Sequence, residues 1–345
     1  MLAANGQLRI TVLYFSPYNR PMSSVTILHN SRAGRATYAK QVERLAEDLT
    51  HDGLAVRLER RDDINGLRAA AREAAAGGAM AVLVAGGDGT VGAIAGELAG
   101  QTTALGILPA GTANVLAKTL HIPRPGLGRT NHLTRAARLL LDSPARPTDL
   151  GCANQDFFLV WAGMGLDALV TQAYERQRQH SRQGAGYVYN VALTFVAARG
   201  WRGLNLTLRS NGGPSGAIEV SGHFLMATVC HTGWHGGGLF SFTDDFRLDD
   251  GLMDLWAFEG QTYAEGLALA AQVFTGRHHR GHPKIHRLTG NSFEFVAAEP
   301  QMFQTDAEPK PATLNLSVRV LPRSLRLLVP PAAASQLYRD HGSQA

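Results

Sequence analysis

Three glycine-containing loops hold the side chains of this sequence that are best suited to chemistry. The fullest is Gly-Gly-Asp-Gly-Thr, which follows an apolar run (Ala81–Ala85) and precedes a helical pattern (Val91–Leu98). A strand that leads through glycines into a helix presents backbone N–H groups and the positive end of the helix dipole to a phosphate. A lone carboxylate there would repel phosphate, so we expect Asp88 to hold Mg²⁺ against a nucleotide. The expected nucleotide contacts in this loop are Gly86, Gly87, Asp88, Gly89 and Thr90.

The same arrangement recurs at two other strand ends. The strand-like run Thr103–Leu108 leads into a polar loop before a helical pattern, and the turn Asn30–Gly34 follows the strand-like run Val25–His29. One glycine turn is usually a simple connection, but three at successive strand ends favour a phosphate site. The further residues expected at the nucleotide are Asn30, Gly111, Thr112 and Asn114.

Two groups of carboxylates are candidates for proton transfer and metal binding. Asp306 and Glu308 are two residues apart, so in a strand both could face one side. A solvated acidic turn beside Lys310 is the alternative. A denser acidic group lies within eleven residues and comprises Asp244, Asp245, Asp249, Asp250 and Asp254. Such carboxylates repel one another unless they are solvated or bind a cation, although Asp-Gly is also a common hairpin turn.

The order of the expected elements predicts two domains. Up to about residue 148, strand-like and helical patterns alternate, which is typical of a parallel sheet covered by helices. Residues 149–329 contain many strand-like runs separated by glycine turns, which favours a mainly antiparallel, β-rich sandwich. Helices are expected near Gly186–Ala198 and Tyr263–Thr275. Residues 1–22 are expected to be a loose extension, and residues 330–345 a tail that packs back on the first domain.

Composition limits the partners. The net charge of +5 and the pI near 9.4 favour anionic partners, but aromatic-basic RNA-binding motifs and zinc-finger spacings are absent, so we expect no nucleic acid. The sequence has no apolar run of the ~18 residues that span a membrane. Cys152 and Cys230 lie in apolar, strand-like surroundings and are expected to be buried free thiols. The histidine- and arginine-rich segment Arg277–Arg287 matches no zinc module and is expected to be a basic surface.

At these motifs the sequence resembles the diacylglycerol kinase catalytic family, which includes bacterial diacylglycerol kinases and sphingosine kinases. Its Asn-Pro-x-x-Gly turn is similar to Asn30–Gly34, its Gly-Gly-Asp-Gly-Thr loop is intact, and its next glycine loop is similar to Gly111–Val115. The likeness continues through Gly163–Asp167, Leu248–Asp254 and Thr305–Glu308, and so covers roughly residues 25 to 330. Ser31, Val115 and Ala307 depart from the family pattern, and Ala307 replaces a glycine.

The resemblance implies an NAD kinase/diacylglycerol kinase-like α/β domain that binds ATP, followed by a β-rich domain for a lipid substrate. It implies Glu308 as the general base, with Asp306 as the second choice. It also implies a structural Mg²⁺ held by the Asp250 side chain and by the backbone carbonyls of Arg247 and Leu252.

These inferences predict an ATP-dependent lipid kinase acting on diacylglycerol or a related lipid such as ceramide or a sphingoid base. The protein is expected in the cytoplasm, in transient contact with the anionic inner face of the membrane. The sequence does not decide between a monomer and a homodimer. The shared Gly-Gly-Asp-Gly loop keeps an NAD kinase-like enzyme as an alternative. A non-catalytic nucleotide or lipid sensor with the same fold is the other.

Overall fold

The computed structural model describes residues 10–14, 24–32, 37–126, 131–180 and 199–339. The described chain forms two compact units. Unit 1 comprises residues 1–148 and Ser324–Gln336, and unit 2 comprises Asp149–Arg323 and residues 337–345. The helix expected near Gly186–Ala198 lies outside the described residues.

A parallel sheet forms the centre of unit 1. Its strands are β2 (Ser24–Asn30), β3 (Ala55–Arg61), β4 (Ala81–Gly86) and β5 (Ala104–Pro109). They pair in the order β3-β2-β4-β5, all parallel. β4 and β5 are buried along their whole length, because helices cover both faces of a parallel sheet.

An additional edge strand corrects the expectation of a loose extension over residues 1–22. Residues Ile10–Tyr14 form β1, which pairs antiparallel with β3 from Ile10 opposite Arg60 to Tyr14 opposite Val56. The segment reads Ile-Thr-Val-Leu-Tyr, and β-branched and aromatic residues of this kind favour strands. It therefore extends the sheet at its β3 edge.

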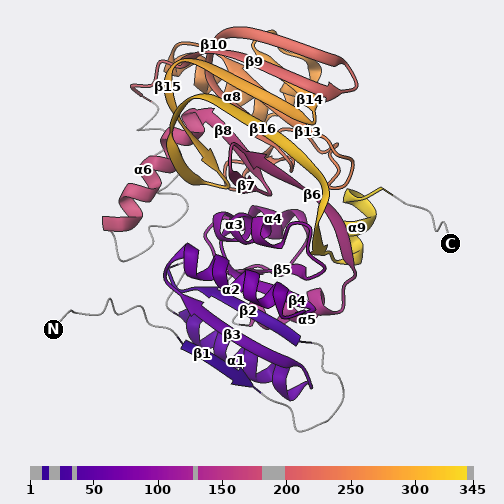
Figure 1. Ribbon diagram of the computed structural model, residues 1–345. Coiled ribbons are helices and arrows are strands. Elements are labelled where there is room, and N and C mark those ends of the chain that lie inside the picture. The colour runs from indigo at the N-terminus through magenta and orange to yellow at the C-terminus, as the bar shows by residue number, and fades with distance from the viewer. Residues whose placement is uncertain (1–9, 15–23, 33–36, 127–130, 181–198, 340–345) are drawn as a thin grey trace. The chain divides into compact units, whose positions relative to one another are not determined.

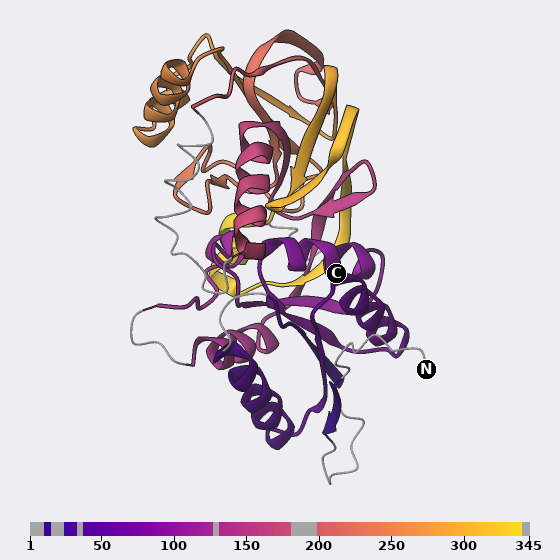
Figure 2. The same ribbon diagram turned by 90° about the vertical axis from the view of Figure 1, so that its left-hand side faces the viewer.

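Helices cover the two faces of the unit 1 sheet (Figure 2). One face carries α1 (Thr37–His51) and α5 (His132–Leu141), and the other carries α2 (Ile64–Ala76) and α3 (Asp88–Leu98). The α2 helix is alanine-rich, and the Asp63 carboxylate caps it by accepting the Gly66 N–H at 2.6 Å. The short helix α4 (Val115–Thr119) follows the loop after β5.

The expected C-terminal tail contains a short helix. Residues Pro331–Leu337 form α9, which buries Ala333 and Leu337, and proline suits the first position of a helix. The part of this segment that belongs to unit 1 begins earlier than expected, at Ser324, and ends at Gln336. Within it, Leu327 at the end of β16 pairs in parallel with Leu105 of β5.

Unit 2 is a mainly antiparallel β structure (Figure 1). Its central strands pair in the order β16-β15-β8-β10-β13-β14, and β9 pairs with both β10 and β15. These strands are β8 (Trp161–Gly165), β9 (Leu204–Gly213), β10 (Gly216–Cys230), β13 (Met253–Glu259), β14 (Ile285–Gly290), β15 (Ser292–Thr305) and β16 (Glu308–Leu328). The remaining strands are β6 (Ala145–Ala153), β7 (Asp156–Phe158), β11 (Trp234–His235) and β12 (Phe240–Ser241).

Alternation along these strands builds the core of unit 2. In β9, Leu204, Leu206 and Leu208 are buried while the residues between them are more exposed, as expected for a sheet with one buried face. Phe224, Phe293 and Phe295 are fully buried in the same core. Its helical elements are α6 (Leu166–His180), α8 (Tyr263–Phe274) and the 3₁₀ helix η1 (Arg277–Arg280). Cys152 and Cys230 are buried free thiols, which confirms the prediction.

Candidate functional site

The three glycine-containing loops of unit 1 follow strands that end at one edge of the sheet. The register places His29 of β2 opposite Ala85 of β4, and Gly86 opposite Pro109 of β5. In open parallel sheets, ligands bind outside the carboxyl ends of the strands. The loops predicted from the sequence therefore start side by side.

Hydrogen bonds join these loops to one another. The Asn30 side chain donates from Nδ2 to Oγ1 of Thr90 at 2.9 Å, which ties the first loop to the second. The backbone N–H groups of Ala110 and Gly111 both donate to the Gly86 carbonyl at 3.1 Å, which ties the third loop to the second. The three loops thus form one structural element.

Gly87 and Gly111 touch where the second and third loops meet. A Cβ atom at Gly111 would stand 2.4 Å from the Gly87 Cα, closer than real atoms approach, so only glycine fits. Gly87 is also the N-cap of α3, and no side chain caps that helix. Its first N–H groups can therefore serve an anion, and the bare backbone of both loops fits the phosphate chain of a nucleotide.

Asp88 has a role that the loop sequence does not indicate. Its two carboxylate oxygens accept the backbone N–H groups of Val115 and Leu116, each at 3.0 Å, at the start of α4. Burial raises the pKa of Asp88, and the hydrogen bonds from Val115 and Leu116 oppose that shift. The carboxylate fixes the third loop relative to the second, whereas the sequence led us to expect it to hold Mg²⁺.

Asn114 shapes the third loop from inside. It is buried in the left-handed conformation, with φ of 50°. Its Oδ1 accepts the Gly111 N–H at 2.9 Å, and its Nδ2 donates to the Gly111 carbonyl at 2.8 Å. These two bonds close the loop between Gly111 and Asn114, and Thr112 within it is exposed.

In unit 2, Asp306 and Ala307 form the turn between β15 and β16. Thr305 pairs with Glu308 across this two-residue hairpin, and both turn residues have positive φ, 47° at Asp306 and 63° at Ala307. Positive φ at both central positions defines a type I′ turn, which glycine and asparagine favour over alanine. The glycine that the family carries at this position would therefore fit the backbone conformation better than Ala307 does.

The Asp306 carboxylate is buried and binds backbone. Oδ2 accepts the Leu159 N–H at 2.8 Å, and Oδ1 accepts the N–H groups of Val160 and Trp161 at 2.8 and 3.1 Å. These bonds hold the hairpin turn against the segment that leads into β8. Glu308 is half-buried, directly after the turn.

A buried polar pair supports the same turn. The Ala307 N–H donates to Oε1 of Gln304 at 2.9 Å, and Nε2 of Gln304 donates to Oδ2 of Asp167 at 3.0 Å. Burial raises the pKa of Asp167 to about 7, against the opposing effect of the Gln304 hydrogen bond. Asp167, at the start of α6, is thus coupled through Gln304 to the turn that precedes Glu308.

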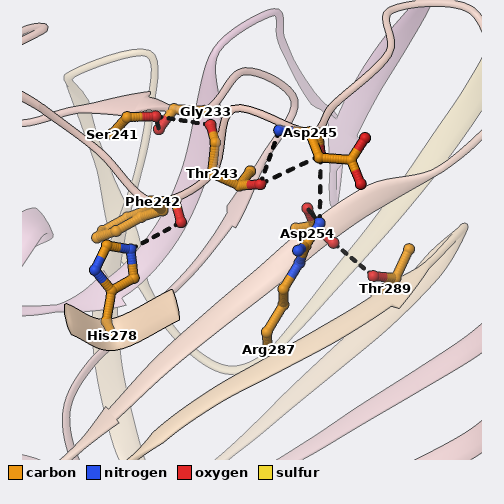
Figure 3. Close-up of polar contacts among 9 residues, drawn as sticks. All are labelled: Gly233, Ser241, Phe242, Thr243, Asp245, Asp254, His278, Arg287 and Thr289. Carbon is orange, nitrogen blue, oxygen red and sulfur yellow. Dashed lines mark hydrogen bonds and ion pairs between the residues drawn. The ribbon is translucent and has the colours of Figure 1, made fainter. Parts of the chain in front are cut away.

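The five carboxylates between Asp244 and Asp254 do not converge on one point. Figure 3 shows Asp254 beside β14, where its carboxylate accepts from Arg287 at 2.8 Å and from the Thr289 hydroxyl at 2.6 Å. Asp249 instead accepts the Arg339 N–H at 3.1 Å. Within the described part of the chain, no group of three or more His, Cys, Asp or Glu side chains is placed to hold a metal ion.

The expected metal ligands Arg247, Asp250 and Leu252 lie in the loop before β13. Oδ1 of Asp250 accepts the Leu252 N–H at 3.0 Å, and its Oδ2 lies 3.6 Å from the Arg339 guanidinium. Burial raises the pKa of Asp250. Nearby, the Asp149 carboxylate accepts the Gly251 and Arg323 N–H groups at 2.6 and 2.7 Å, so protein donors already stabilise this loop.

Two known domains match almost all of the chain. The diacylglycerol kinase catalytic domain matches residues 24–153. The YegS C-terminal NAD kinase beta sandwich-like domain matches residues 161–329. Every loop described above falls inside one of these two matches.

The relatives of this chain carry names from the same two groups as the matched domains. A probable lipid kinase YegS-like protein of Pseudomonas aeruginosa is 33% identical over 66% of this chain and 70% of its own length. A diacylglycerol kinase of Bacillus subtilis is 25% identical over 79% of this chain and 87% of its own length. The crystal structure of a diacylglycerol kinase from Bacillus anthracis shares the fold, with a TM-score of 0.63 at 17% identity over 91% of this chain and all of that one.

Among the described helices, none is both long enough and apolar enough to cross a membrane.

Proposed function

The chain belongs to the diacylglycerol kinase family with the YegS-like lipid kinases, and we propose that it transfers the γ-phosphoryl group of ATP to a lipid hydroxyl. The observation that carries this proposal is that three loops are joined at one edge of the sheet. The Asn30 side chain is hydrogen-bonded to Thr90, and Gly87 contacts Gly111. A phosphoryl-transfer enzyme needs mainly positioning and charge neutralisation, which such loops provide.

ATP is the proposed donor because the loops offer backbone donors to a phosphate chain. The uncapped N-terminus of α3 and the glycine contact between Gly87 and Gly111 leave room for phosphate oxygens near the backbone. In this proposal Asp88 acts by positioning, since it fixes the start of α4, and Asn30, Thr90, Thr112 and Asn114 complete the nucleotide site.

Glu308 is the proposed general base. Three backbone N–H groups already use the Asp306 carboxylate, which suits it to hold the turn rather than to exchange protons. Glu308 is half-buried and follows that turn directly, so the turn fixes its backbone while its side chain retains access to solvent. It would accept the proton of the lipid hydroxyl as that oxygen attacks the γ-phosphorus.

Mg²⁺ completes the proposal, because it neutralises phosphate charge during transfer when it is bound with ATP. Only Asp250 supplies a carboxylate at the structural site that the family resemblance implies. One of its oxygens accepts the Leu252 N–H, and the other lies 3.6 Å from Arg339, so a cation there would have to displace the arginine. The donor set is therefore a modest fit for a second, structural Mg²⁺.

Diacylglycerol, or a related lipid with one hydroxyl beside apolar chains, is the proposed acceptor. The name of the Bacillus subtilis relative supports diacylglycerol. Such a substrate lies in a membrane, so we also propose that the protein acts in the cytoplasm in transient contact with the inner membrane face. The net charge of +5 suits an anionic lipid surface.

A lipid panel tests this function. The purified protein is incubated with γ-labelled ATP, Mg²⁺ and mixed vesicles containing diacylglycerol, ceramide, a sphingoid base, phosphatidylglycerol or a polyprenol, and with NAD in a separate reaction. We expect label in one extracted lipid and none in NAD. Glu308→Gln should abolish the labelling, whereas Glu299→Gln, at an exposed position of β15, should not. Label in NAD alone would overturn the proposal.

A further inference from the structure

The helix α8 is apolar but only one narrow side of it is buried. Of its residues, Leu269 and Val273 are buried in unit 2. Figure 2 shows α8, in orange, at the margin of unit 2, and none of the described helices or strands is drawn on its outer side. Its outward residues are Ala264, Leu267, Ala268, Ala271 and Phe274.

These outward residues form one continuous stripe. At about 100° per residue, the five positions fall within an arc of about 120°, on the side opposite Leu269 and Val273. A helix on the surface of a protein ordinarily turns charged or polar residues to solvent on that side. Here Leu267 is 43% exposed and Phe274 is 57% exposed.

Leu239 extends this stripe across the neighbouring turn. It is 46% exposed and precedes Phe240, whose ring lies 5.0 Å from the Phe274 ring. Six large apolar side chains are exposed in the described part of the chain, and Leu239, Leu267 and Phe274 are three of them. We call the surface formed by Leu239, Ala264, Leu267, Ala268, Ala271 and Phe274 the α8 patch.

The helix that carries the patch is firmly attached. Thr262 and Glu265 form a capping box at its start, and Lys284 donates to Glu265 at 2.6 Å. Just after its end, the His278 ring is hydrogen-bonded to the Phe242 carbonyl at 2.9 Å (Figure 3). Because both ends are fixed, the apolar stripe is exposed by the fold itself.

The charges around the patch favour an anionic partner. Glu265 is the single acidic residue of α8, it lies outside the stripe, and it is paired with Lys284. Arg277 is exposed in η1, which follows the helix within three residues and has the sequence Arg-His-His-Arg. The patch therefore combines a wide apolar stripe with a basic end.

We propose that the α8 patch is the surface by which this protein docks on an anionic phospholipid membrane. A helix that exposes an apolar stripe can lie in the membrane interface with that stripe at the acyl boundary, while basic residues beside the helix meet the headgroups. The inference rests on the proposed function in one respect, that a lipid acceptor has to be reached in a membrane. Leu267 and Phe274 insert, and Arg277 meets the headgroups.

Vesicle binding by the full-length chain, without nucleotide, tests the docking surface. Sedimentation with phosphatidylcholine vesicles containing graded phosphatidylglycerol should show binding that rises with anionic lipid and falls with salt. The double variant Leu267→Ser/Phe274→Ser should bind at least about tenfold more weakly, because two apolar side chains no longer enter the bilayer. Leu314→Ser is the matched control, since Leu314 is 46% exposed, between Leu267 and Phe274, but lies on β16, and this variant should bind as the wild type does.

A local probe makes the result specific. An environment-sensitive fluorophore attached to Phe274→Cys should shift to the blue on addition of vesicles, and the same label on Leu314→Cys should not. The two native thiols are buried, so labelling is selective. Unchanged binding by the double variant would overturn the proposal. So would a shift at position 274 that depends on protein concentration without vesicles, which would identify the patch as a contact between copies.

The experiments can overturn the proposed docking surface and the proposed lipid kinase activity independently of each other. Vesicle binding through the patch without phosphorylation of any lipid would retain the docking surface and overturn the proposed function. Phosphorylation of a lipid dispersed in detergent, unchanged in the double variant, together with wild-type vesicle binding by that variant, would do the reverse.

Discussion

Asp306 and Trp161 are hydrogen-bonded in both directions. The Asp306 carboxylate accepts the Trp161 N–H at 3.1 Å, and the Asp306 N–H donates to the Trp161 carbonyl at 2.9 Å. The pair joins the hairpin turn between β15 and β16 to the start of β8. It gives Asp306 a structural role in the turn, and the proposed general base is Glu308, two residues further along the chain.

Substitution of these two acids should therefore give opposite results. In Asp306→Asn an amide N–H₂ replaces one acceptor oxygen opposite buried N–H groups, so the free energy of unfolding should fall by about 1–3 kcal/mol. Glu308→Gln should leave it nearly unchanged but remove most lipid phosphorylation. Denaturant titration and the labelling assay measure the two effects. A stable but inactive Asp306→Asn variant would move the base to Asp306.

Ala307→Gly should stabilise the protein by about 1 kcal/mol. Ala307 has φ of 63°, a conformation that costs little for glycine and more for alanine. Ala312→Gly, at an exposed position of β16 outside the positive-φ residues, should instead destabilise it by about 0.5–1 kcal/mol. Thermal unfolding of both variants checks the sign of each change. Destabilisation by both would mean that the turn is not strained by alanine.

Asp88→Asn should weaken nucleotide binding and stability together. The amide keeps one acceptor for the N–H groups of Val115 and Leu116 but loses the charge at the start of α4, at a cost of about 1–3 kcal/mol. Asp63→Asn is the control, since Asp63 caps α2 and should affect stability without changing ATP affinity. Calorimetric titration with ATP measures the difference. Full ATP affinity in Asp88→Asn would contradict a positioning role.

The pH dependence of stability should depend on Asp167. Burial raises its pKa from 3.8 to about 7, so the folded protein keeps a proton that the unfolded chain releases near pH 4. The stabilisation that the protonated Asp167 adds to the free energy of unfolding is therefore complete below about pH 4 and is lost as the pH rises to about 7. Asp167→Asn should remove this loss, so its stability relative to the wild type should increase between those values. If the free energies of unfolding of Asp167→Asn and of the wild type changed equally with pH across that range, the raised pKa would be contradicted.

Local patterns were sufficient to predict the fold class and the three loops. Strand-like and helical runs alternate up to β5, Gly87 directly follows β4, and Gly111 lies two residues after β5, so the loops could be identified from short segments. The helix expected over Tyr263–Thr275 is confirmed as α8 (Tyr263–Phe274). Each of these features depends on residues that are close in sequence, which is why the sequence alone indicates them.

Long-range contacts account for what the sequence did not indicate. Asp88 bonds to N–H groups 27 and 28 residues away, and Asp306 bonds to N–H groups about 145 residues away. No local pattern encodes such pairs. The exposed stripe of α8 is a similar case, because its apolar periodicity predicts a helix but does not say which side of the helix the rest of unit 2 covers.

Transfer of label from γ-labelled ATP into lipid is the decisive test of the proposed lipid kinase activity. Vesicles containing diacylglycerol are mixed with the wild type, with Glu308→Gln or with Glu299→Gln, and radioactivity is counted in the extracted lipid after chromatography. We expect a phosphorylated lipid with the wild type and Glu299→Gln, and at most a trace with Glu308→Gln. Folded wild-type protein that binds ATP but labels no lipid hydroxyl across the whole panel would contradict it.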